Sequence, residues 1–245
     1  MRNVLTIARR EFFAYFGSPV AYIAIAVFLV LLGVTFFFEI PFLLPKDDFF
    51  EAREATLRPL FEWMVFLFTI ILPAISMRLL AEERRMGTLE LLLTLPVTET
   101  EVVAGKFLGA LGFLGIATGL TLAYPLLVAV LGNPDPGPIV GGYFGVLLVG
   151  AAYLAVGLLA SAWTGSQITA FLVAILICAA FTFVDRLPEA VGLRQMEAAN
   201  LMSFNAHFRS IARGVIDTRD VVFFLTVIVG AVALASHSLE SRKWR

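Results

Sequence analysis

Residues 80–106 read LAEERRMGTLELLLTLPVTETEVVAGK, the densest run of charge in the chain, and they stand between two long apolar segments. Across all 245 residues, 60% are hydrophobic, 15% are charged, and the mean hydropathy is +0.90. A soluble domain of this length could not bury so much apolar surface. The composition therefore predicts an all-α integral membrane protein in which this charged stretch lies outside the bilayer.

Six apolar stretches are long enough to cross roughly 30 Å of hydrocarbon, since a helix rises about 1.5 Å per residue. The expected spans are residues 20–40, 59–79, 105–131, 141–162, 168–184 and 221–238, which make residues 1–245 a single transmembrane domain. The first stretch is too long, and begins too late, to be the apolar region of a cleaved signal peptide. We therefore expect it to remain in the mature protein.

Six spans place both termini on one side of the membrane, and basic residues near the span ends indicate which side. The segments on the side of the termini carry Arg2, Arg9, Arg10, Arg78, Arg84, Arg85, Lys106, Arg242, Lys243 and Arg245. The opposite segments carry Lys46, Arg53, Arg58, Arg186, Arg194, Arg209, Arg213 and Arg219, spread over two longer stretches. Because the first arginines usually dominate orientation, we expect both termini to be cytoplasmic.

Helix signals divide the charged segment, residues 80–104, into two parts. Thr98 and Glu101 have the spacing of a capping box, so the helix that enters the third span should begin before the membrane. Pro96 ends the helix that precedes it. Residues 88–95 then form a short amphipathic helix, which either rests on lipid headgroups or inserts into a groove on a cytoplasmic partner.

Several stretches together resemble one family of membrane proteins. The stretch AEERRMGTLELLLTLPVTETEVVAGKFLG, residues 81–109, resembles the cytoplasmic segment of membrane subunits of type-2 ABC exporters. The stretch ARREFFAYFGSPVAYI, residues 8–23, is similar to that family's connector helix before the first span. The stretches SFNAHFRSIARGVIDTRDVVFF, residues 203–224, and LESRKW, residues 239–244, are similar to its gliding-motility-associated branch.

The resemblance implies an ATP-driven exporter subunit that forms the translocation path, pairs with a second copy as a homodimer, and lies in the bacterial cytoplasmic membrane. It also implies a separate P-loop ATPase subunit that binds ATP and Mg²⁺. The chain itself does not match G-x-x-x-x-G-K-[ST], because Phe107 follows Gly105 and Lys106, and Thr100 stands at the position of the first glycine. We therefore expect no catalytic residue and no cofactor in this chain. A heterodimer with a related permease and an extracytoplasmic accessory protein stay open.

The resemblance places the ATPase contact on the charged segment. The expected coupling residues are Glu82, Glu83, Arg84, Arg85, Gly87, Thr88, Leu89 and Glu90. Residues 1–18 form the connector, whose helical pattern places Arg9 and Arg10 on the polar side, toward the lipid headgroups. Glu11 falls on the apolar side, so we expect it to contact protein rather than lipid.

The segment 185–218 is expected to lie outside the cell membrane and to contain a short amphipathic helix, capped by Ser203 and ended by Gly214. The resemblance implies that this helix roofs the translocation path, and the outer-gate candidates are Phe204, His207 and Phe208. The alternative is a helix that only stabilises the spans. Neither His207 nor His237 has clustered histidines or carboxylates nearby in sequence, which favours surface hydrogen-bonding residues over a metal site.

Charge and polar residues argue against several other functions. The ionisable residues in the predicted spans, Glu39, Glu62, Arg78 and Asp185, lie at span ends, whereas ion-coupled carriers usually place carboxylates centrally. The lone Cys178 forms no internal disulfide and no cysteine metal site. A net charge of −1 and a pI near 6.1 do not favour nucleic acid as a partner.

Two further functional classes and one packing question stay open. A non-transporting membrane anchor of an ATPase-linked envelope complex would share the same spans, and a membrane-embedded lipid-modifying enzyme would need polar groups that converge at one depth. The spans also hold small residues four positions apart, which pack helices either within one subunit or across a dimer. These pairs are Gly105/Gly109, Gly115/Gly119, Gly141/Gly145 and Gly157/Ser161.

Overall fold

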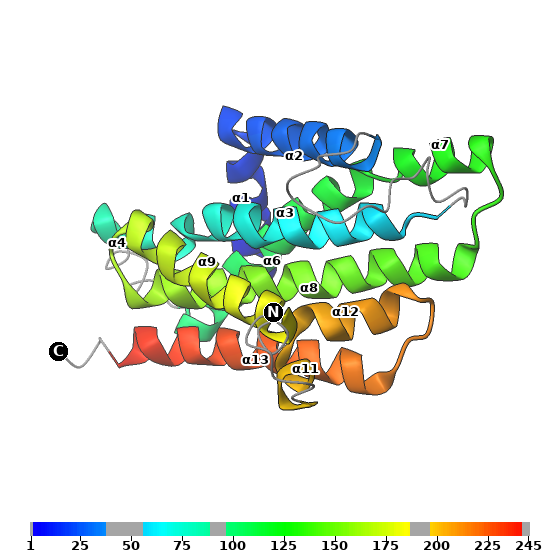
Figure 1. The fold of residues 1–245 in the computed structure, drawn as a ribbon. Coiled ribbons are helices and arrows are strands. Elements are labelled where there is room, and N and C mark those ends of the chain that lie inside the picture. The colour runs from blue at the N-terminus through cyan, green and yellow to red at the C-terminus, as the bar shows by residue number, and fades with distance from the viewer. Residues whose placement is uncertain (1, 38–55, 89–96, 187–196, 242–245) are drawn as a thin grey trace.

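The computed structural model describes residues 2–37, 56–88, 97–186 and 197–241, and the regular elements within these ranges are helices (Figure 1). Six helical segments are long and apolar enough to cross a membrane: Pro19–Phe37, Arg58–Arg85, Glu99–Leu131, Pro136–Trp163, Gln167–Arg186 and Thr218–Glu240. The prediction of an all-α membrane protein with six spans is therefore confirmed. The chain is a multi-pass membrane protein.

The helices follow one another with short connections. The first half contains α1 (Arg2–Phe16), α2 (Pro19–Phe37), α3 (Arg58–Ser76), α4 (Arg78–Arg85), α6 (Glu99–Leu120) and α7 (Ala123–Leu131). The second half contains α8 (Pro136–Trp163), α9 (Gln167–Phe183), the short 3₁₀ helix η1 (Val184–Arg186), α11 (Glu197–Met202), α12 (Phe204–Ala212) and α13 (Thr218–Glu240).

Local capping sets where several helices begin. Thr98 and Glu101 form the predicted capping box, so α6 starts at Glu99, several residues before the apolar stretch. Asp135 caps α8 through the N–H of Gly137. The third span differs from the prediction in being two helices, α6 and α7, which are separated by a turn at Thr121 and Leu122.

Helix α8 runs through the middle of the bundle and contacts α3, α6, α9, α12 and α13 (Figure 1). These contacts require small residues, because a Cβ on Gly142 would collide with the ring of Phe61, and a Cβ on Gly157 would collide with the hydroxyl of Ser76. Small residues that let backbones approach closely are typical of packed membrane helices. In contrast, α2, α9 and α13 lie at the periphery and leave large apolar faces exposed, which suits contact with lipid.

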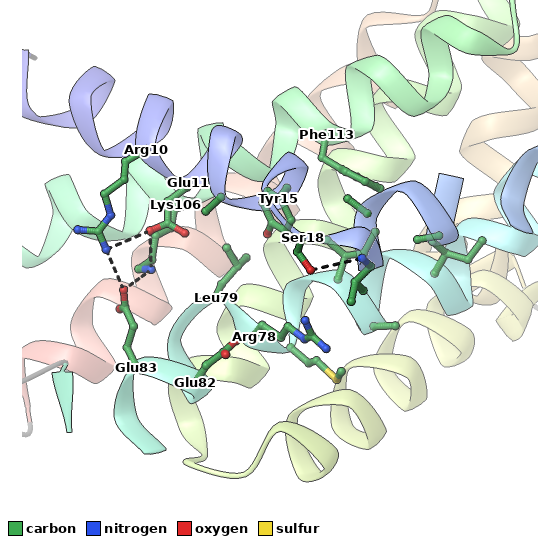
Figure 2. Close-up of a pocket in the computed structure, with 18 of the residues that line it drawn as sticks. Arg10, Glu11, Tyr15, Ser18, Arg78, Leu79, Glu82, Glu83, Lys106 and Phe113 are labelled. Atoms are coloured by element: carbon green, nitrogen blue, oxygen red, sulfur yellow. Dashed lines mark hydrogen bonds and ion pairs between the residues drawn. The ribbon is translucent and has the colours of Figure 1, made fainter. Parts of the chain in front are cut away.

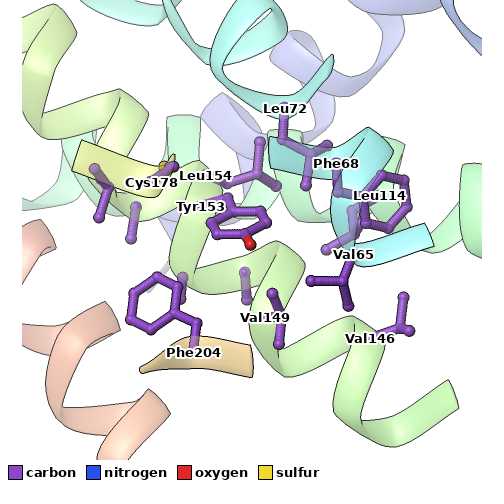
Figure 3. Packing of buried hydrophobic residues seen from close by; sticks show 14 of the residues in the cluster. Val65, Phe68, Leu72, Leu114, Val146, Val149, Tyr153, Leu154, Cys178 and Phe204 are labelled. Carbon is purple, nitrogen blue, oxygen red and sulfur yellow. The ribbon is translucent and has the colours of Figure 1, made fainter. Parts of the chain in front are cut away.

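The core around α8 contains one buried polar cluster (Figure 3). The hydroxyl of Tyr153 lies 3.1 Å from Oγ1 of Thr69 on α3 and 2.6 Å from Oγ1 of Thr182 on α9. Phe204 of α12 packs against the Tyr153 ring, with 5.7 Å between ring centroids. Because its hydrogen-bonding groups are satisfied, this cluster joins three elements without leaving a polar group exposed to lipid.

The second span is interrupted between α3 and α4. At this break Ser161 of α8 supplies the missing hydrogen bonds: its Oγ accepts from the N–H of Leu80 at 3.0 Å and of Ala81 at 2.8 Å, and donates to the carbonyl of Met77 at 2.9 Å. Pro73, four residues upstream of Met77, lacks an N–H and further weakens the helix there. The break fixes the direction in which α4 leaves the bundle.

The opposite end of the bundle is covered by α12. Ser203 accepts the N–H of Ala206, Gly214 has a φ of 86°, and Asp217 caps α13, so the predicted helix boundaries in this region are confirmed. Left-handed backbone favours glycine at Gly214.

The prediction that His207 is a surface residue was wrong. Its Nδ1 lies 2.6 Å from Oδ1 of Asp220, its Nε2 lies 3.1 Å from the carbonyl of Leu201, and the ring stacks on Phe223. His207 is buried because Asp220 comes from the next helix, a tertiary contact that sequence proximity could not reveal. His237 is exposed, as predicted.

Candidate functional site

The N-terminal helix meets the charged segment at one end of the bundle, and glycines of α6 make the contact possible. A Cβ on Gly105 would lie 2.7 Å from the Cβ of Ile7, and a Cβ on Gly109 would lie 2.7 Å from the Cβ of Glu11. Because these glycines are spaced by about one helical turn, α1 lies directly against the backbone of α6. This close approach brings Glu11 within reach of Lys106.

Lys106 is the centre of a network of four charged side chains (Figure 2). Its Nζ lies 3.1 Å from Oε1 of Glu11 and 2.7 Å from Oε1 of Glu83, and only 2% of its side chain is exposed. Nη2 of Arg10 lies 3.8 Å from the same oxygen of Glu83 and 3.9 Å from that of Glu11. We call these four residues, from α1, α4 and α6, the charged junction.

The burial of Lys106 makes the junction sensitive to the loss of any partner. Two carboxylates and two cations balance in formal charge, so the intact network leaves no net charge in the interior. Removing one member of a buried ion pair typically costs about 3–5 kcal/mol, because the remaining charge is left uncompensated. Arg10 is largely exposed and can follow the carboxylates only at longer distance. Lys106 therefore carries most of the compensation.

The junction links three helices that are distant in sequence. Glu83 lies on α4, which extends beyond the break in the second span, while Lys106 lies near the start of the third span. A displacement of α4 must either carry Lys106 and Glu11 along or separate buried charges. The arrangement can therefore act as a mechanical link between α4, α6 and α1.

The predicted coupling residues fall into two groups in the structure. Glu83 faces the junction, and Nη2 of Arg84 donates to the carbonyl of Ala162 at 2.7 Å, so both side chains have contacts inside the chain. Glu82 is half-buried, whereas the remaining described members of the set are exposed: Arg85, Gly87 and Thr88. Leu89 and Glu90, and the helix predicted over residues 88–95 apart from Thr88, lie outside the described residues.

Comparison with known proteins supplies the family. The family described as ABC-2 family transporter protein matches residues 5–243, nearly the full length of the chain. The chain belongs to this ABC-2 transporter family. A search of curated proteins found no match. Membership makes this permease a transmembrane subunit of an ABC transporter, and the family implies an ABC ATPase subunit as its partner.

The connector residues of the permease lie as the helical pattern indicates. Arg9 and Arg10 are on the exposed side of α1, where the guanidinium of Arg9 lies 5.7 Å from the ring centroid of Phe13. The expectation that Glu11 contacts protein is confirmed by its ion pair with Lys106.

Sequence reasoning did not identify Lys106 as a site residue. A signal was present, because Lys106 is the sole basic residue between positions 99 and 131, and Glu11 on an apolar helix face requires a cation. The 95 positions between the two residues could be bridged only by the packing of α1 on α6.

The outer-gate candidates of the permease lie inside the subunit. Phe204 and Phe208 are fully buried, and the ring of Phe204 packs among the aromatic residues of α8, α9 and α13. His207 is bonded to Asp220, which ties α12 to α13. These three residues hold α12 over the end of the bundle, and any opening there must move α12 as a unit.

Proposed function

We propose that this ABC-2 permease uses the charged junction to couple a separate ATPase subunit to its spans. The observation that carries the proposal is the buried Lys106, bonded at once to Glu11 of α1 and Glu83 of α4. Buried ionisable groups at membrane helices are costly and mark functional connections. The ATPase contact lies on the exposed end of α4, at Arg85, Gly87 and Thr88, and continues through Leu89 and Glu90.

The coupling follows from the position of α4. When ATP draws two ATPase subunits together, each pulls on the α4 of its permease, and Glu83 transmits that displacement to the start of the third span. For ATP to shift the spans, the ATPase pair must bind one conformation of the permease more tightly than the other. The junction supplies the rigid connection by which that difference reaches α6.

The working assembly in this proposal is a homodimer of the permease. Most of the small-residue pairs pack within the subunit, since a Cβ on Gly105, Gly109, Gly141 or Gly145 would meet other side chains or backbone of the same chain. Gly115 and Gly119 differ, because a Cβ on either would meet open space on an exposed part of α6. That part of α6 suits close packing against a second copy.

The direction of transport and the location follow from the same proposal. The chain exports its cargo across the bacterial cytoplasmic membrane with both termini in the cytoplasm, and it belongs to the gliding-motility-associated branch. The distribution of arginines and the resemblance of residues 203–224 and 239–244 to that branch support this. ATP and Mg²⁺ bind to the partner, and this chain performs no hydrolysis itself.

Co-purification with mass spectrometry tests the two parts of the coupling separately. A tagged wild-type chain should recover a P-loop ATPase, Arg85→Glu should lose it, and Lys106→Met should retain it while losing coupled ATP hydrolysis. Arg213→Glu is the matched control, an exposed arginine at the opposite end of the bundle. Equal recovery with Arg85→Glu and Arg213→Glu would refute this docking position, and absence of any ATPase after crosslinking would refute the coupling function.

A further inference from the structure

A cavity of about 620 Å³ opens beside the charged junction, between α1, α2, α3 and α4 (Figure 2). Its inner wall is apolar and formed by small and branched residues of α2 and α3: Ala21, Ala24, Ile71, Ala74 and Ile75. Val20 and Ile70 also line it and are 45% and 44% exposed on spans that face lipid. The cavity is therefore open to the bilayer, and an occupant with acyl chains can extend them into the membrane.

The polar rim of this cavity carries two charged side chains that the junction does not use. Arg78 and Glu82 both line the cavity from α4, four residues apart, which is about one helical turn of 5.4 Å. Within the described part of the chain, neither side chain has a hydrogen bond or ion pair. A cation and an anion thus stand one turn apart at the rim of an apolar cavity.

Tyr15 adds an unused hydrogen-bond donor to the same rim. Its hydroxyl is buried and has no hydrogen-bond partner among the described residues. Burial raises the pKa of Tyr15, with a further contribution from the neighbouring carboxylate of Glu11, so the hydroxyl keeps its proton at neutral pH. A buried hydroxyl without a partner is destabilising unless a ligand or water occupies the position.

The charges around the cavity select the class of ligand. Its lining contains three cations, Arg10, Arg78 and Lys106, and three anions, Glu11, Glu82 and Glu83, so the formal charges sum to zero. Such a site has no excess positive charge to attract an anionic lipid. A zwitterionic headgroup meets both free charges, and a primary ammonium can donate hydrogen bonds to a carboxylate, which a quaternary ammonium cannot do.

We propose that this cavity binds a phospholipid with a phosphoethanolamine headgroup, taken from the leaflet on the side of α1 and α4. Arg78 and the Tyr15 hydroxyl bind the phosphate, Glu82 binds the ammonium, and the acyl chains lie against Ala74 and leave between α2 and α3. A planar guanidinium suits phosphate because it can donate two parallel hydrogen bonds. The bound lipid would fill the space between the connector helix and the second span.

Native mass spectrometry of the full chain in mild detergent tests this proposal. The chain is titrated with dioleoyl phosphatidylethanolamine, phosphatidylcholine and phosphatidylglycerol, and the first should bind most tightly. Arg78→Gln should weaken its binding about tenfold, equivalent to about 1.4 kcal/mol. Glu82→Gln should remove the preference for ethanolamine over choline. Arg85→Gln is the control, an exposed arginine on the same helix that does not line the cavity, and it should change nothing.

Variants that fill the cavity separate this site from general lipid adhesion. Ala74→Trp from one wall, or Ala24→Phe from the other if the first fails to elute as the wild type does, should abolish binding of all three lipids. Unchanged binding in the folded filled variant would overturn the proposal, as would tightest binding of phosphatidylglycerol or equal losses with Arg78→Gln and Arg85→Gln. The measurement needs no ATPase, so its outcome is independent of the proposed coupling function.

Discussion

Replacing Lys106 by methionine keeps much of the side-chain volume and removes the positive charge that lies between Glu11 and Glu83. Both carboxylates then stay partly buried, with only Arg10 nearby at 3.8 and 3.9 Å. Breaking a buried ion pair typically costs about 3–5 kcal/mol. Because Arg10 compensates in part, we expect about 3 kcal/mol. For a chain of this size 1 kcal/mol lowers the midpoint of thermal unfolding by about 2–4 °C, so the expected decrease is about 6–12 °C.

The assay is thermal unfolding in detergent, with two further variants that identify the cause. Arg85→Met removes an exposed arginine and should change stability by less than about 0.5 kcal/mol. The triple variant Glu11→Gln/Glu83→Gln/Lys106→Met removes both anions together with the cation, and it should recover most of the loss, since a buried ionic cluster can be replaced by neutral groups at little cost. A decrease below about 2 °C for Lys106→Met, or a triple variant as unstable as the single one, would refute the reasoning.

Two further variants test the packing of α1 and the contact between α12 and α13. Gly109→Leu should displace α1 and lower the unfolding midpoint, while Gly119→Leu, which enters open space, should not; equal effects measured in the same thermal assay would contradict the packing. His207→Ala leaves the buried carboxylate of Asp220 without its histidine and should cost about 1–3 kcal/mol. His237→Ala, on an exposed side chain, should stay within about 0.5 kcal/mol in denaturant unfolding, and a similar loss in both histidine variants would argue against the buried pair.

Features that depend on neighbouring residues could be predicted from the sequence. The six spans follow from the length of the apolar stretches, and the start of α6 follows from the spacing of Thr98 and Glu101. The contact of Glu11 with protein was also predictable, because a carboxylate on the apolar face of a helix needs a partner.

Features that depend on helices packing together could not be predicted. The partner of Glu83 is 23 positions away, that of Glu11 is 95 positions away, and both meet Lys106 only because glycines let α1 approach α6. The hydrogen bonds of Ser161 at the break between α3 and α4 likewise depend on the position of α8. The sequence therefore indicated where charge gathers, while the structure divides the coupling residues into a buried junction and an exposed end of α4.

The central claim is that the charged junction transmits the action of the ATPase to the spans. The most direct measurement places a single cysteine at the exposed Ile216, in a Cys178→Ala background, and follows its labelling rate in the reconstituted permease–ATPase complex with and without ATP and vanadate. We expect the nucleotide to change the rate when the junction is intact, and to leave it unchanged in a folded Lys106→Met complex that still retains the ATPase. An equal nucleotide response in both complexes would contradict the claim.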